Sequence, residues 1–193
     1  MEEAAALARE SGDMVVTSFV LCNLGSVALA AGDRERAQAA SLEALELHRK
    51  SPPELQRANT LGTALATLGV VALFQGRLCE ARERLTESLS LALQSRDLPT
   101  LPPQLTRFAA LAAGEGDFRR AAFLLGAADA LCERTDFEFG LEPLESDLHE
   151  RTESEARTNL TQEEFVKARE EGRKVAPEEA AAVALERSAP RQA

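Results

Sequence analysis

The sequence predicts an all-α protein built from packed helical hairpins, and three observations lead to this fold class. Ala, Leu, Glu and Arg dominate the chain, while Trp and Tyr are absent and β-branched runs are nearly lacking, which favours helix over strand. One pattern of small residues occurs three times, each time with a glycine between two helical stretches. Proline stretches, "KSPPE" at 50–54 and "DLPTLPP" at 97–103, separate the copies, because proline lacks an amide donor and restricts its predecessor.

The three copies begin at Asn23, Thr67 and Arg107 and stay in phase throughout. In each, an apolar residue and a small one are followed by an alanine, then a glycine, then a second alanine. These positions are Leu24, Gly25, Ala28, Gly32 and Ala37; Leu68, Gly69, Ala72, Gly76 and Ala81; and Phe108, Ala109, Ala112, Gly116 and Ala121. We expect the glycines to end the first helix of each hairpin in the left-handed conformation, and the small residues to let paired helices approach closely.

This pattern sets the expected element boundaries. The hairpins are expected at about 14–50, 54–96 and 103–134, after a partial repeat at 1–12 in which "ALARESGD" reads like "LALQSRD" at the end of the second hairpin. We expect Gly114 to let the first helix of the third hairpin end early. Residues 135–193 are expected to form a connector and C-terminal capping helices with the last few residues disordered: an acidic helix near 143–158, one that opens with a Thr161 and Glu164 capping box, and one that begins after Pro177.

The motif L-G-x2-A, followed by A-x3-S in the first copy and A-x3-L in the others, resembles the tetratricopeptide repeat. The Trp and Tyr of that pattern are missing, and the glycines lie 44 and 40 residues apart instead of about 34, so the helices are expected to be longer. This longer form is similar to the C-terminal arms of large ATP-binding bacterial regulators, the MalT-like and LuxR-type activators. The resemblance implies a right-handed solenoid over residues 1–134, capped at its C-terminal end, that serves as a non-catalytic protein-interaction scaffold or as a regulatory arm in signal transduction and transcription regulation.

In that family the first helices line a concave groove. The resemblance places Phe19, Cys22, Ser26, Leu29, Thr63, Ala66, Val70, Leu73, Leu105, Ala110 and Ala113 in that lining. These residues are small and apolar, so the expected partner is an apolar helix or another domain of a regulator. Two alternatives remain open at this stage: the same residues pack adjacent repeats together, or the groove binds a small effector molecule.

Charge and cysteine content restrict the partners further. A net charge of -10 repels nucleic acid and anionic membranes, so neither is an expected direct partner. The start lacks a secretory signal and the three cysteines form no C-x-x-C pair, which favours a cytoplasmic protein. Because the first twelve residues read as a lone second helix, we expect a fragment or a truncated descendant of a longer regulator.

No catalytic residue, metal ligand or cofactor site is expected. The G-x-G-x-x-G pattern from Gly114 fails at Arg119, and "HERTE" from His149 ends in Glu153 where a zinc protease needs a second histidine. The carboxylates Glu142, Glu145 and Asp147 are expected to be solvated, as are the arginines near the starts of second helices, Arg34, Arg36, Arg77, Arg82, Arg84, Arg119 and Arg120. Cys22, Cys79 and Cys132 are expected to be small core or groove residues.

Overall fold

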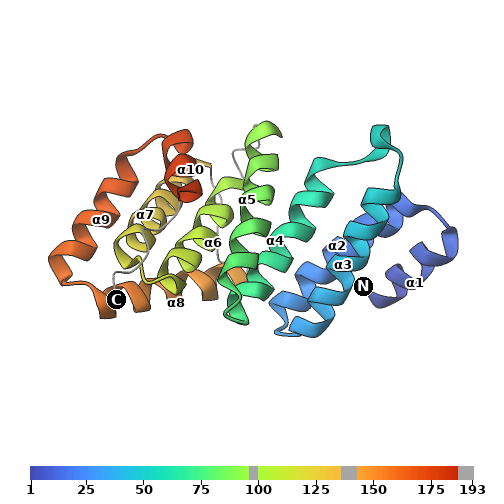
Figure 1. Cartoon of the computed structure of the whole chain (residues 1–193), viewed down its shortest axis with the longest axis horizontal. Coiled ribbons are helices and arrows are strands. Elements are labelled where there is room, and N and C mark those ends of the chain that lie inside the picture. Colours follow the sequence, from blue (N-terminus) through green and yellow to red (C-terminus); the bar gives the residue numbers. More distant parts are fainter. Residues whose placement is uncertain (96–99, 136–142, 187–193) are drawn as a thin grey trace. The chain divides into compact units, whose positions relative to one another are not determined.

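The computed structural model describes residues 1–95, 100–135 and 143–186, and these residues are helical almost throughout (Figure 1). The described ranges contain ten α-helices, one short 3-10 helix and no strand, so the predicted all-α class is confirmed. The chain divides into two compact units, unit 1 (Met1–Arg96) and unit 2 (Asp97–Ala193).

Unit 1 consists of two helical hairpins preceded by a single helix. Helix α2 pairs with α3 and α4 pairs with α5, while α2 and α3 also pack against α4. The core between them is formed by residues such as Leu21, Leu45 and Leu65, which are at most 2% exposed. The elements are α1 (Glu2–Ser11), α2 (Met14–Ala30), α3 (Arg34–Lys50), the 3-10 helix η1 (Pro53–Leu55), α4 (Ala58–Phe74) and α5 (Leu78–Ser95).

Unit 2 joins the third hairpin to the C-terminal helices. Helix α6 pairs with α7, α9 packs along α7, and α8 and α10 each contact both α6 and α7. This grouping differs from the expected boundary at residue 134, because the faces of α6 and α7 are covered by the helices that follow them. The elements are α6 (Leu101–Gly114), α7 (Phe118–Thr135), α8 (Pro143–Asn159), α9 (Gln162–Lys174) and α10 (Pro177–Leu185).

The three glycine turns have the same geometry. Gly32, Gly76 and Gly116 have φ angles of 82°, 70° and 81°, which confirms the predicted left-handed conformation. In each turn, the residue after the glycine donates its backbone N–H to the carbonyl of the repeat alanine: Asp33 to Ala28 at 2.9 Å, Arg77 to Ala72 at 2.9 Å and Asp117 to Ala112 at 2.8 Å. The alignment of the three repeats in the sequence is therefore matched by the same turn hydrogen bond in each hairpin.

The expectation for Gly114 was wrong. Helix α6 ends at Gly114, two residues before Gly116, just as α2 ends two residues before Gly32. The α6 helix is short because it begins late, at Leu101, with Pro102 in its first turn.

The small residues do bring helices close together in unit 1. A Cβ atom on Gly25 would overlap the hydroxyl of Ser41 and lie 3.2 Å from the carbonyl oxygen of Ala37, both on α3. On Gly69 a Cβ atom would lie 2.7 Å from the side chain of Leu85 on α5. Each hairpin therefore depends on a glycine in its first helix at the point of closest approach.

Two local features predicted from the sequence at the C-terminal end, a capping box and a helix start, are also confirmed. The backbone N–H of Thr161 donates to Glu164 Oε2 at 2.9 Å and the backbone N–H of Glu164 donates to Thr161 Oγ1 at 3.2 Å, which is the predicted capping box. Pro177 is the first residue of α10. Most of the connector, part of the "DLPTLPP" stretch and the terminal residues expected to be disordered lie outside the described residues.

Candidate functional site

The α2 helix of unit 1 has an exposed apolar face. Its large side chains Val16, Phe19 and Val27 are 46%, 49% and 52% exposed. Together with the half-buried Val20 and Asn23 they fall at spacings of three, four and seven residues, which places them on one side of the helix. These residues are called the α2 face below. Half-exposed valine and phenylalanine side chains leave apolar surface in water, and covering that surface is favourable.

The rest of α2 is held firmly, which explains why this face remains open. Asp13 caps the helix by accepting from the backbone N–H groups of Val15 and Val16 at 2.9 and 3.1 Å. On the opposite side, Ser18 Oγ donates to the backbone carbonyl of Ala44 on α3 at 2.9 Å. The α2 face is therefore presented by a helix that is capped at its start and packed against its partner.

The predicted groove residues differ in exposure, and about half of them are buried. Phe19 is exposed and belongs to the α2 face, and Ser26, Thr63, Leu73 and Ala110 are partly exposed. The others are at most 5% exposed, a fraction typical of packing residues: Cys22, Leu29, Ala66, Val70, Leu105 and Ala113. Leu105, Ala110 and Ala113 belong to unit 2, and the rest belong to unit 1. The groove lining itself stays a prediction.

Sequence reasoning missed Val16 and Val27. The signal was present, because both residues share the helical face of Phe19. The α2 sequence is apolar nearly all round, however, so periodicity alone does not show which side is open.

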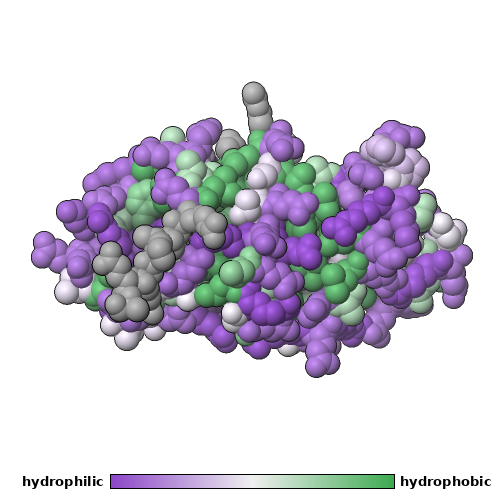
Figure 2. All heavy atoms as spheres, viewed as in Figure 1, coloured by the Kyte–Doolittle hydropathy of each residue, from purple (hydrophilic) through white to green (hydrophobic). Residues whose placement is uncertain are grey.

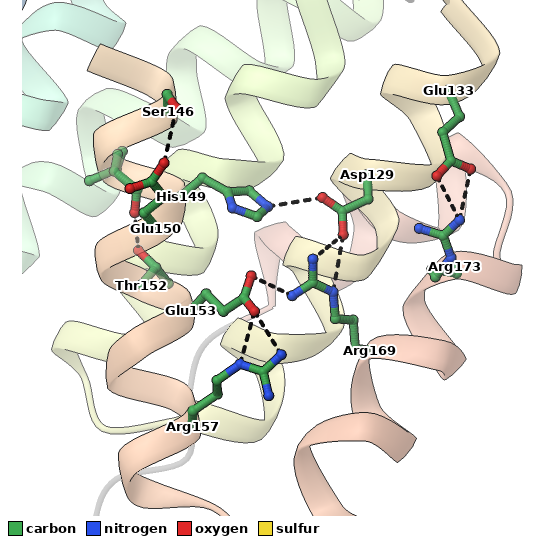
Figure 3. Close-up of polar contacts among 11 residues, drawn as sticks. Asp129, Glu133, Ser146, His149, Glu150, Thr152, Glu153, Arg157, Arg169 and Arg173 are labelled. Carbon is green, nitrogen blue, oxygen red and sulfur yellow. Dashed lines mark hydrogen bonds and ion pairs between the residues drawn. The ribbon is translucent and has the colours of Figure 1, made fainter. Parts of the chain in front are cut away.

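Unit 2 contains a polar network that joins three helices (Figure 3). Asp129 on α7 contacts His149 Nε2 on α8 at 2.9 Å through one oxygen and accepts from Arg169 on α9 at 2.6 Å through the other. Arg169 also pairs with Glu153 on α8 at 2.6 Å, and Glu153 pairs in turn with Arg157 at 2.8 Å. These ion pairs link α8 and α9 to α7 through side chains that are far apart in the sequence.

The charges in this network shift pKa values. Burial raises the pKa of Asp129, but hydrogen bonds from His149 and Arg169 and their charges outweigh it, so the pKa lies below its ordinary value. The pKa of Glu153 is likewise lowered by Arg169 and Arg157 against the effect of burial. Both carboxylates are therefore ionised at neutral pH, and the network is held by charge.

A separate buried ion pair corrects the expectation that the acidic helix is simply solvated. Glu145 is 3% exposed, and it pairs with Arg107 Nη2 on α6 at 2.5 Å. Asp147, in contrast, is half exposed and pairs with Arg151 one turn along α8, as a solvated carboxylate does. Glu142 lies outside the described residues.

The cysteines lie in three different environments. Cys22 is buried, and burial raises the pKa of its thiol to about 11. The pKa of Cys132 is raised to about 12 by burial and by the charge of Asp129. Both are protonated thiols at neutral pH. Cys79 is exposed, so the expectation of a core or groove position was wrong for it.

Within ranges 1–95, 100–135 and 143–186, no group of three or more His, Cys, Asp or Glu side chains could hold a metal ion. Over the same ranges, no helix combines the length and apolar character needed to cross a bilayer. Compared with protein-family models, with curated proteins and with solved structures, the chain has no match.

Proposed function

We propose that this chain is a non-catalytic protein-interaction scaffold or regulatory arm of tetratricopeptide type. In this proposal its hairpins stack as a right-handed solenoid, and the C-terminal helices cap one end. The repeated glycine turns and the close contacts at Gly25 and Gly69 support the repeat interpretation. No cofactor or metal takes part.

The observation that carries the proposal is the α2 face. Val16, Phe19 and Val27 are each about half exposed on a helix that is otherwise fixed by its cap and by α3. An amphipathic helix laid along this face would cover the three side chains with its own apolar stripe. The partner is therefore an apolar helix, supplied by another protein or by a further domain of a regulator.

The resemblance to the arms of bacterial regulators gives the proposal its biological setting. The chain would be part of, or derived from, a cytoplasmic signalling or transcription regulator. Its net charge of -10 makes direct nucleic-acid binding unfavourable, so DNA contact would belong to other domains.

Affinity capture with matched variants tests this function. We expect the variant with Phe19→Glu and Val27→Glu to retain helical circular dichroism, because both positions are half exposed, and to lose its protein partner. Truncating or charging a central apolar contact costs about 2 kcal/mol or more, so binding should weaken roughly thirtyfold. Ala39→Glu combined with Gln94→Glu, which adds two negative charges at exposed positions of α3 and α5, is the control and should capture normally.

Equal capture by both variants would remove the α2 face from the proposal. A saturable thermal shift with a metabolite in the absence of any protein partner, if it is abolished by Leu73→Glu at a partly exposed position of the predicted groove lining, would instead favour the effector-binding alternative.

A further inference from the structure

Unit 1 has an open cavity of about 390 Å³ between α3 and α5. Its walls come from two hairpins, with Leu42, Leu45, Glu46, Arg49 and Lys50 on α3 and Arg84 on α5. This volume falls within the range of small-molecule sites in proteins. The cavity is separate from the α2 face, because no α2 residue lines it.

Two of the cations that line the cavity have no carboxylate partner among the residues that the structure describes. Arg84 has Glu80 four residues before it and Glu87 three residues after it, both within reach on a helix. Yet Glu80 pairs with Arg77, and no ion pair forms at Arg84 in the part of the chain that the structure describes. Arg49 is likewise unpaired among the described residues, although 32 acidic residues outnumber 22 basic ones in the chain.

The remaining charges do not neutralise these arginines. Glu46 pairs with Lys50 at 2.6 Å, so the only lining carboxylate is already matched by the only lining ammonium. The cavity therefore carries the charge of two guanidinium groups. Guanidinium presents a planar fork of donors that fits carboxylate and phosphate oxygens.

The cavity also has an apolar wall. Leu45 is 2% exposed, while Leu42 is 44% exposed. Figure 2 shows hydrophilic side chains over much of the viewed face, interrupted by apolar patches. A ligand that is anionic at one end and apolar at the other would contact both kinds of surface at once.

We propose that the cavity between α3 and α5 binds a small organic anion with a doubly charged head group and an apolar body. Arg49 and Arg84 hold the head group, and Leu42 and Leu45 contact the body. Phosphate monoesters and aromatic dicarboxylates share this chemistry. The inference adds a ligand site to the chain, and it does not depend on the protein partner proposed above.

Isothermal titration of the full chain with phenyl phosphate, phthalate and inorganic phosphate tests the site. We expect saturable binding of phenyl phosphate or phthalate. Arg84→Gln and Arg49→Gln should each weaken this binding about tenfold or more, because each removes one charge-assisted contact to the anion. Arg57→Gln, which removes an equal charge from an exposed position at the start of α4, should leave affinity unchanged.

The three probes separate the two parts of the site. Leu42→Ser should weaken the binding of phenyl phosphate and phthalate but not the binding of inorganic phosphate. The organic probe that binds more tightly identifies the head group. The proposal is overturned if neither organic probe binds saturably up to about 10 mM, because the two charge-assisted contacts at Arg49 and Arg84 should give tighter binding than that. It is also overturned if Arg57→Gln weakens binding as much as Arg84→Gln does.

A second readout is independent of affinity. The chain has two histidines, and His48 is next to Arg49 whereas His149 lies in unit 2. Burial and then the Arg49 charge lower the pKa of His48. An anion on Arg49 should therefore move the imidazole NMR signal of His48 and leave that of His149 in place. Equal movement of both signals would contradict a site at Arg49.

Discussion

Replacing Gly126 by alanine is expected to lower the free energy of unfolding by about 3 kcal/mol. Gly126 on α7 lies where α9 crosses, and a Cβ atom there would overlap the backbone carbonyl of Arg169. The contact is reciprocal, because a Cβ atom on Gly172 of α9 would overlap the backbone carbonyl of Phe123. Backbone atoms cannot rotate away as a side chain does, so α9 must move off α7. Urea unfolding followed by circular dichroism measures the loss.

A glycine in unit 1 supplies the matched control. Gly62 lies inside α4, and the nearest atom to a Cβ placed on it is Ser88 Oγ at 3.9 Å. Gly62→Ala therefore meets no obstacle and should stabilise the chain by up to about 1 kcal/mol through helix propensity. If Gly126→Ala stabilised the chain to the same degree, the close crossing of α7 and α9 would be refuted.

Asp129→Asn is expected to lower the free energy of unfolding at pH 7 by about 2–3 kcal/mol, because Arg169 and His149 both lose a charged partner in a partly buried place. The variant should also be less sensitive to acid. The pKa values of Asp129 and Glu153 are lower in the folded chain than their ordinary values. Their contribution to the free energy of unfolding is therefore complete when the pH is above the ordinary carboxyl pKa values. It is lost as the pH falls through the lowered pKa values of the folded chain.

Urea unfolding at a series of pH values between neutral and strongly acidic measures this effect. The wild-type chain should lose more stability over that interval than Asp129→Asn, so the two curves should converge at low pH. Asp147→Asn is the control, since Asp147 is half exposed and pairs only along its own helix, and it should change stability by less than about 1 kcal/mol. Parallel pH curves for the wild type and Asp129→Asn would show that the network does not hold α8 and α9.

The features that could be predicted from the sequence are local ones. The glycine turns, the capping box at Thr161 and the start of α10 at Pro177 each depend on a few neighbouring residues with known backbone preferences. The hairpins could be found because the same local signals recur in phase.

The features that escaped prediction depend on contacts between distant segments. Gly126 meets Arg169, and Asp129 meets His149 and Arg169, only once α8 and α9 have folded onto α7. One signal was available, since a glycine inside a helical stretch costs stability unless packing requires it. The burial of Glu145 had no signal in its acidic surroundings, because its partner Arg107 lies 38 residues earlier.

The candidate site was predicted only in part for the same reason. Phe19 was expected on a binding surface and is exposed, but Val70 and Leu105 are each 1% exposed. A run of apolar residues shows that a helix packs on several sides, and only tertiary structure shows which side is left open.

The most direct measurement is site-specific photo-crosslinking in cells that normally produce the chain. A benzoylphenylalanine at position 19, and separately at position 27, should give one discrete covalent adduct with the same protein, because both side chains lie on the α2 face. The same group at Glu35, an exposed position on α3, should give none. Adducts that are absent from positions 19 and 27, or that are identical at position 35, would contradict the proposal that the α2 face binds a protein.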